Sequence, residues 1–246
     1  MKHKNIKNKN KVILKSEKIK FVEHFFELKN RFFIWFFAFI LLSFFGYIIY
    51  PKILYLLTKP LNQPLYYTSP AGAFEVVFSI SFFFGFITSL PIFLYQLLKF
   101  VNPEYDNKVY YLIIFSLFLT LSGIFTCYYF VLPQSLIFLA KFGGQELTAL
   151  ISTHDYLDFV MKYLISFAII FQIPLIAIVA NKIQKINLKI MLINFRYIFL
   201  ISFIVSALIT PTQDLINQSI IALPILILYL ISIFLVWIIQ NKGLRR

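Results

Sequence analysis

The chain has 246 residues, of which 60% are apolar and only 13% are charged. Soluble domains carry about 45–50% apolar and about 25% charged residues, so this chain lacks the polar side chains that a water-exposed surface requires. The composition excludes a soluble enzyme, a disulfide framework and a disordered protein, and it predicts an integral membrane protein. The 23 Lys and Arg residues against 10 Asp and Glu give a net charge of +13.

Uncharged apolar runs long enough to cross a bilayer recur along the chain. About 20 helical residues span the roughly 30 Å hydrocarbon core, and continuous runs predict helices, whereas barrel strands would alternate. We expect an all-α integral membrane protein with six transmembrane helices in a kinked, concave bundle over residues 21–240. The predicted spans are 32–50, 76–98, 109–132, 160–180, 197–213 and 219–239, between a basic N-terminal arm (1–20) and a basic tail (241–246).

Prolines punctuate these predicted spans. Pro51 follows the first span, Pro133 ends the third and Pro211 ends the fifth, so we expect these three to lie at helix ends. Pro91 and Pro174 lie inside spans, where neighbouring helices tolerate a kink.

The basic residues are concentrated on one side of the predicted bundle. The N-terminal segment to Arg31, the loops 99–108 and 181–196 and the tail hold 19 Lys and Arg residues together, and the loops of the other side hold three. Cytoplasmic loops carry an excess of Lys and Arg, so both termini are expected on the cytoplasmic or matrix side. The charge of +13 is therefore interpreted as a topology signal, and no nucleic-acid partner is expected.

Two carboxylates precede the first predicted span. Glu23 and Glu27 are four residues apart, and Arg31 follows one helical turn later. Residues at this spacing share one helix face. Two interpretations are open: a surface helix with a Glu27–Arg31 ion pair, or a carboxylate site for a basic ligand.

The loop 99–108 carries Glu104 and Asp106, the only acids on the predicted cytoplasmic side outside the N-terminal segment. Carboxylates beside an aromatic residue suit the recognition of a guanidinium group, which pairs in bidentate fashion and stacks on rings. A turn nucleated by Pro103 is the structural alternative.

Polar residues also mark the later spans. Gln172 lies at mid-span in FQIPL, where it must form hydrogen bonds or face a cavity; a bridge between helices and a polar groove lining are both open. Asp214 and Gln218 lie in TPTQDLINQ, where Asp214 fits a turn or a helix cap. The sequence contains no metal, phosphate-loop or nucleophile–base pattern, so we expect a binding function with no catalytic residue, metal or cofactor.

Five ordered sequence blocks resemble the TatC family, the multispanning receptor subunits of the twin-arginine protein translocase. The resemblance runs from about Phe21 to Ile239 and implies a concave six-helix bundle with cytoplasmic termini. The blocks are EHFFELKNRF at 23–32, LPIFLYQLLKFVNP at 90–103, FQIPL at 171–175, FRYIFL at 195–200 and ITPTQDLINQSIIALP at 209–224.

The resemblance implies a transport function without enzymatic activity. Such a protein recognises the paired arginines of signal peptides on folded cargo and acts with small single-span subunits of the TatA and TatB type, driven by the proton-motive force. Glu27 falls on the family's signal-contacting glutamate, and Phe100 and Pro103 fall on the aromatic and proline of its first cytoplasmic loop.

The sequence departs from the family pattern at two of these positions. Lys29 stands where the family signature has arginine, which keeps the charge without the planar guanidinium fork. Val109 stands where the family usually has a second glutamate, so Glu104 or Asp106 would have to supply that carboxylate.

The resemblance leaves the membrane and some partners to be predicted. We expect contacts with membrane lipid and a homo-oligomer within the receptor complex. The abundance of residues with A/T-rich codons and the lack of a visible presequence favour the mitochondrial inner membrane, with the plastid thylakoid and the bacterial plasma membrane as alternatives. A polytopic transporter or channel, or a respiratory-complex membrane subunit, is the alternative function, although the predicted span interiors carry no charges and no paired histidines.

Overall fold

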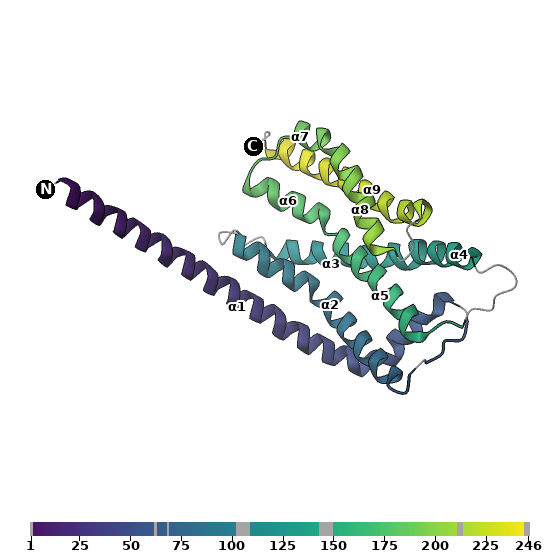
Figure 1. Cartoon of the computed structure of the whole chain (residues 1–246). Helices are drawn as coiled ribbons and strands as arrows, with labels where there is room; N and C mark the ends of the chain where they lie inside the picture. The colour runs from purple at the N-terminus through teal and green to yellow at the C-terminus, as the bar shows by residue number, and fades with distance from the viewer. Residues whose placement is uncertain are drawn as a thin grey trace.

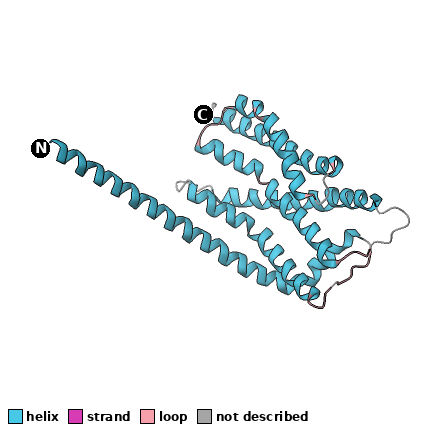
Figure 2. Ribbon diagram, in the orientation of Figure 1, coloured by secondary structure: helices cyan, strands magenta, loops and turns pink. Residues whose placement is uncertain are grey.

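The computed structural model describes residues 2–61, 63–67, 69–101, 109–142, 150–210 and 214–243, with side chains described from Phe26 to Asn241 outside these gaps and outside positions 109 and 140–142. The described residues are almost entirely helical (Figure 2). The elements in chain order are α1 (Lys2–Thr58), the 3-10 turn η1 (Lys59–Leu61), α2 (Gly72–Val101), α3 (Val109–Thr126), the π-helical segment η2 (Cys127–Val131), α4 (Leu132–Phe142), α5 (Thr153–Ile170), α6 (Ile173–Ile183), α7 (Leu188–Ile193), α8 (Phe195–Ile209) and α9 (Leu215–Gly243).

The prediction of an all-α multispanning membrane protein is confirmed. Five helical stretches are long and apolar enough to cross a membrane, and α8 is a shorter apolar helix. Two of the long stretches are made of several elements: α3, η2 and α4 form one continuous rod, and α5 and α6 are separated only by a turn at Phe171 and Gln172. The long stretches are Phe26–Leu61, Gly72–Val101, Tyr110–Leu139, Thr153–Ile183 and Leu215–Asn241.

Two of the expected helix ends are wrong. Pro51 lies inside α1, which runs on to Thr58, and Pro133 is the second residue of α4. At Pro133 the preceding η2 already departs from α-helical bonding, since the Leu132 N–H bonds to the carbonyl of Cys127, five residues earlier. The missing N–H of proline therefore falls beside a turn that is already widened. At its other end α1 begins at Lys2, so the basic arm continues the first helix.

Helices α1 and α2 run side by side in opposite directions along one edge of the bundle (Figure 1). Small residues bring their backbones close together, as is common between membrane helices. A Cβ atom on Gly85 would overlap Ser43 Oγ and would lie 2.8 Å from the Ser43 amide nitrogen. A Cβ atom on Gly46 would lie 3.0 Å from the carbonyl oxygen of Ser81. This pairing fixes the register between the first two spans.

The core of the bundle is centred on α5, where Val160, Tyr163 and Phe167 are fully buried. At the end of the bundle where α5 begins, two connections are joined by main-chain hydrogen bonds. The Tyr66 N–H donates to the Ile151 carbonyl (3.2 Å), and the Thr153 N–H donates to the Tyr66 carbonyl (2.9 Å). The connection from α1 to α2 is thereby tied to the start of α5.

Candidate functional site

Glu27 and Arg31 form an ion pair near the beginning of the membrane-spanning part of α1. Arg31 Nη2 lies 2.5 Å from Glu27 Oε1, and Arg31 Nε donates to the same oxygen over 3.1 Å. The Glu27 side chain keeps 35% of its surface exposed, whereas Arg31 keeps 15%. The predicted ion pair is therefore present, and the carboxylate remains accessible from outside the protein.

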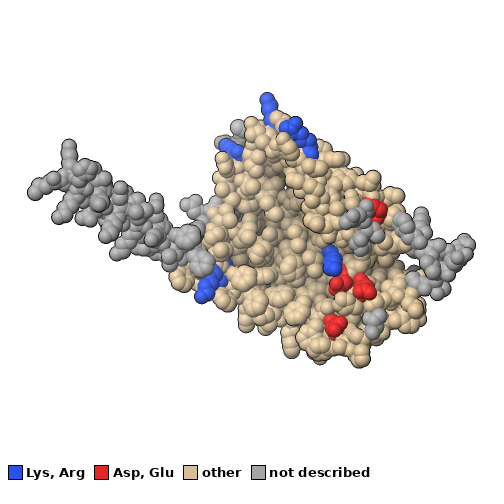
Figure 3. All heavy atoms as spheres, in the orientation of Figure 1, with Lys and Arg blue, Asp and Glu red and all other residues tan. Residues whose placement is uncertain are grey.

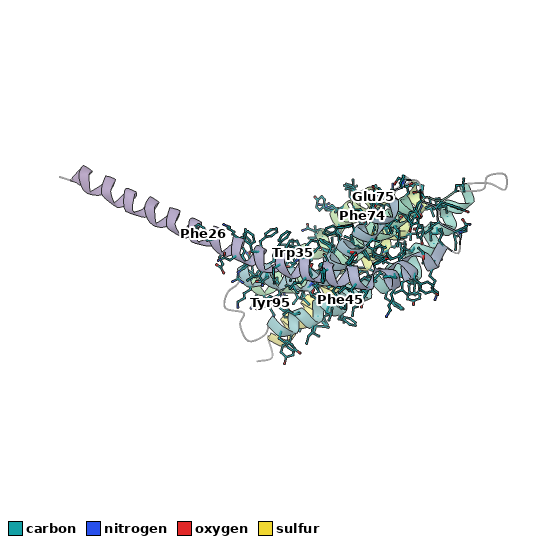
Figure 4. The ribbon with its side chains drawn as sticks, turned by 90° about the horizontal axis from the view of Figure 1, so that it is seen from below. Phe26, Trp35, Phe45, Phe74, Glu75 and Tyr95 are labelled. Atoms are coloured by element: carbon teal, nitrogen blue, oxygen red, sulfur yellow. The ribbon has the colours of Figure 1, made fainter. Side chains whose placement is uncertain are left out.

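The neighbouring side chains of α1 secure this end of the helix to α2. Trp35 Nε1 donates to Ser89 Oγ over 3.2 Å, and the ring centroids of Trp35 and Phe93 lie 5.1 Å apart. Six residues before Trp35, the Lys29 ammonium group lies 5.8 Å from the centroid of the Phe33 ring, in the range of a cation–π interaction. Figure 4 shows Trp35 on the stretch of α1 that packs along α2, with Phe26 where α1 leaves the bundle.

The antiparallel register places the predicted second block beside Glu27. Trp35 lies opposite Ser89 and Ser43 lies opposite Gly85, and both helices rise about 1.5 Å per residue. Continued toward the N-terminus of α1, this register sets Glu27 level with the last turn of α2, which holds Lys99 and Phe100. The structure therefore brings the two blocks to one end of the bundle.

The other residues that the sequence predicts for this site lie outside the part of the chain that the structure describes. The side chain of Glu23 and the residues Pro103, Glu104 and Asp106 lie outside the described residues. Pro211 also lies outside them.

Gln172 forms the polar centre of the bundle. Gln172 is only 2% exposed. With α3 it forms two side-chain hydrogen bonds: Ser116 Oγ donates to Gln172 Oε1 (3.0 Å), and Gln172 Nε2 donates to Thr120 Oγ1 (3.0 Å). Gln172 Nε2 also donates to the Ala168 carbonyl of α5 (3.2 Å). Of the two interpretations, the structure shows the bridge, which joins α3 to the junction of α5 and α6.

Asp214 caps helix α9. Asp214 Oδ1 accepts the Asn217 N–H over 2.7 Å, and Oδ2 accepts from Asn217 Nδ2 over 3.1 Å. Gln218 donates its own N–H to the Asp214 carbonyl over 3.1 Å. A carboxylate that accepts an N–H three residues later is the usual arrangement of an N-cap, so Asp214 and Gln218 serve the start of the last helix.

Charged side chains separate along the long dimension of the bundle. On the face drawn in Figure 3, Lys and Arg gather at the end where α7 and the start of the bundle part of α1 lie, and Asp and Glu gather toward the other end. Lys162 pairs with Asp158 over 3.4 Å. Within the described part of the chain, no group of three or more His, Cys, Asp or Glu side chains is placed to hold a metal ion.

Sequence reasoning missed two tyrosines that serve the end of α1. Tyr128 Oη donates to the Leu56 carbonyl over 2.8 Å, and Tyr156 Oη donates to the Leu57 carbonyl over 2.9 Å. Pro60 is the feature of the sequence that indicates such a contact. It has no N–H to donate to the Leu56 carbonyl four residues earlier, which therefore needs another donor.

Known proteins resemble this chain over most of its length. The family of Sec-independent protein translocase proteins (TatC) matches residues 23–224. The chain is 32% identical to the Sec-independent protein translocase protein TatC of Aquifex aeolicus (strain VF5) over 225 residues, which cover 87% of this chain and 92% of the relative. It is 30% identical to the uncharacterized tatC-like protein ymf16 of Reclinomonas americana over 233 residues, which cover 91% and 89%.

Solved structures agree with the sequence matches. The crystal structure of the twin arginine translocase receptor TatC superposes with a TM-score of 0.76 at 30% identity, covering 87% of this chain and 98% of that chain. A second crystal structure of the receptor, in DDM, gives a TM-score of 0.77 at the same identity.

Proposed function

Because the chain belongs to the TatC family and is a non-enzymatic subunit of the twin-arginine, Sec-independent protein translocase, we propose that Glu27 receives an arginine of the twin-arginine signal peptide. Family membership decides against the transporter, channel and respiratory-subunit alternatives. It implies signal-peptide recognition and partners within the Tat complex.

The observation that carries this proposal is the ion pair between Glu27 and Arg31. An incoming arginine offers the carboxylate the same guanidinium chemistry that Arg31 already supplies from one turn away. The Glu27 side chain keeps 35% of its surface exposed, so a ligand arginine can reach the carboxylate and compete with Arg31 for it. In this mechanism Arg31 holds the carboxylate in place until the signal peptide arrives.

The last turn of α2, which lies at the height of Glu27, supplies the second part of the proposed site. Phe100 would give an aromatic surface for the guanidinium group of the second arginine, since guanidinium planes stack on rings. Pro103 would shape the following turn, and Glu104 or Asp106 would provide the second carboxylate. Lys29 and Glu23 complete the proposed site at its border.

The proposed assembly follows the family pattern. The protein would bind folded cargo through its signal peptide, act with small single-span subunits of the TatA and TatB type and with further copies of itself, contact membrane lipid, and use the proton-motive force. Both termini would face the cytoplasm or matrix, on the strength of the 19 basic residues on that side.

For the membrane, we favour the mitochondrial inner membrane, with the plastid thylakoid and the bacterial plasma membrane as the alternatives. The support is compositional: the chain is rich in Phe, Ile, Lys, Asn and Tyr, whose codons are A/T-rich. Immunodetection in purified organelles tests this assignment, and recovery in any other membrane fraction would refute it.

Crosslinking to a precursor tests the role of Glu27. A photo-crosslinker at the exposed Phe26 should capture a precursor with an Arg-Arg signal and should capture its Lys-Lys counterpart much less. Glu27→Gln should lower the Arg-Arg yield at least tenfold, because the carboxylate charge is lost while the shape is kept, and Glu27→Asp should retain part of it. Glu75→Gln is the matched control, since Glu75 lies at the opposite end of the bundle, as the distance between Glu75 and Phe26 in Figure 4 illustrates. Undiminished crosslinking and export by an inserted Glu27→Gln protein would overturn the proposal.

A further inference from the structure

The connection between α6 and α8 is held as a fixed platform on the end of α9. Asn181 Oδ1 accepts the Ile186 N–H (3.1 Å) and a hydrogen bond from Gln240 Nε2 (2.7 Å), which also donates to the Ile186 carbonyl (2.8 Å). Further along, Tyr229 Oη donates to the Met191 carbonyl over 2.9 Å, and the Met191 side chain is buried against α9. The backbone of this connection is therefore anchored at both of its ends.

Exposed cations project from this platform. Lys185, Lys189 and Arg196 are all exposed, and Arg196 lies over the Tyr197 ring at 4.8 Å while Nη2 donates to the Tyr197 hydroxyl. The sequence has no Asp or Glu between Asp158 and Asp214, so no acid of this stretch neutralises them. Figure 3 shows basic side chains without acidic neighbours where α7 lies in Figure 1.

Large apolar side chains are exposed between these cations. Ile190, Leu192 and Ile193 of α7 are each more than half exposed, as is Tyr197 at the start of α8. The connection joins two apolar helices, α6 and α8, and therefore lies at a membrane boundary. A short element with basic side chains and exposed Ile and Leu is typical of the zone where headgroups meet acyl chains.

We propose that this surface, the α7 patch, binds an anionic phospholipid. It is formed by Lys185, Lys189, Arg196, Ile190, Leu192, Ile193 and Tyr197. The three cations would hold the phosphate of the headgroup, with Arg196 oriented by its stacking on Tyr197 for bidentate pairing. The isoleucines and leucine would contact the first methylene groups of the acyl chains.

The combination of charge and apolar surface selects a phospholipid over other anionic ligands, and the anchoring of the platform favours binding. Within residues 185–197 the patch combines three positive charges, for which no ion pair with a described carboxylate is found, with exposed apolar side chains, and a soluble anion would use only the charges. Its platform is anchored before any ligand binds, so little ordering cost opposes binding. The inference does not depend on the role of Glu27, which lies on a different helix.

Lipid titration of the purified full-length protein tests the α7 patch. In micelles of a zwitterionic detergent, dioctanoyl phosphatidylglycerol and dioctanoyl phosphatidylcholine are added separately, and bound lipid is counted by native mass spectrometry. The test variant is Lys185→Gln/Lys189→Gln/Arg196→Gln. The matched control is Lys52→Gln/Lys59→Gln/Lys162→Gln, which removes the same charge from the other predicted side of the bundle.

We expect wild type to bind phosphatidylglycerol at least tenfold more tightly than phosphatidylcholine. The test variant should lose affinity for phosphatidylglycerol on the order of 100-fold, from three cations near the headgroup, while the control and Glu27→Gln should bind as wild type does. If the test variant does not fold, each single substitution should lower the affinity about fivefold.

Three results would overturn the proposal. The first is equal binding of the two lipids by wild type. The second is a test variant that loses no more affinity than the control variant. The third is displacement of phosphatidylglycerol by an equal concentration of inorganic phosphate, which would make the patch a site for soluble anions.

Discussion

The hydroxyl group of Tyr128 donates a 2.8 Å hydrogen bond to the carbonyl oxygen of Leu56. That carbonyl lies four residues before Pro60, which has no N–H to complete the helical pattern. The hydroxyl group of Tyr156 likewise donates a hydrogen bond to the next carbonyl, that of Leu57. Side chains of the third and fourth spans therefore complete the hydrogen bonding at the end of α1.

Removal of the Tyr128 hydroxyl should loosen this end of the bundle. Tyr128→Phe leaves the Leu56 carbonyl without that donor, and we expect a loss of about 1–2 kcal/mol in unfolding free energy. Thermal unfolding in detergent measures it. Tyr129→Phe is the matched control, because the Tyr129 side chain is 61% exposed. Equal stability of the two variants would show that the bond contributes nothing.

Gly85→Ala should separate the first two spans. The new methyl group would meet both the hydroxyl group and the backbone of Ser43, so we expect destabilisation of about 1–3 kcal/mol. Ser43→Ala should not rescue the variant, since the backbone atoms would still be too close. Gly72→Ala serves as the control, because its nearest neighbour would be Ser69 Oγ at 3.3 Å. Unfolding in detergent compares the three, and a rescue by Ser43→Ala would show that only the hydroxyl group limits the approach.

Gln172→Leu should break the polar bridge between α3 and the junction of α5 and α6. The Ser116 hydroxyl would lose its acceptor and would be left buried, at an expected cost of about 1–2 kcal/mol. Gln172→Glu should be tolerated better, because a neutral carboxylic acid keeps an acceptor for Ser116 and one donor. Thermal unfolding of both variants in detergent tests this order of stability. A leucine variant more stable than the glutamate variant would contradict it.

Arg31→Gln should change signal-peptide affinity in a direction that reveals the role of Arg31. If Arg31 holds the carboxylate until the ligand arrives, its neutral variant should bind an Arg-Arg signal peptide at least about twofold more tightly, because the competing, partly buried pair is lost. Binding of a labelled peptide to the purified protein measures this. A weaker affinity would instead make Arg31 a residue that positions Glu27 for binding.

The all-helical, multispanning fold could be predicted from the sequence, because long apolar runs dominate it. The sequence also marked Gln172 and Glu27, because a polar group in an apolar run and two carboxylates at helical spacing stand out. It misjudged Pro51 and Pro133, since local rules treat proline as a helix end, whereas neighbouring helices in a membrane can compensate for the lost bond. The π-helical turn at Cys127–Val131 and the tyrosine contacts with α1 depend on packing between distant spans, which no local pattern encodes.

The two main-chain bonds between Tyr66 and residues 151–153 have a mechanical consequence. Together with the Tyr156–Leu57 bond they join the end of α1, and the connection that leads from it to α2, to the beginning of α5. Helices that are bonded to one another at one end of a bundle can separate most at the opposite end. We therefore expect any opening of the protein to be hinged here, so that a force applied at Glu27 acts over nearly the full length of the first span.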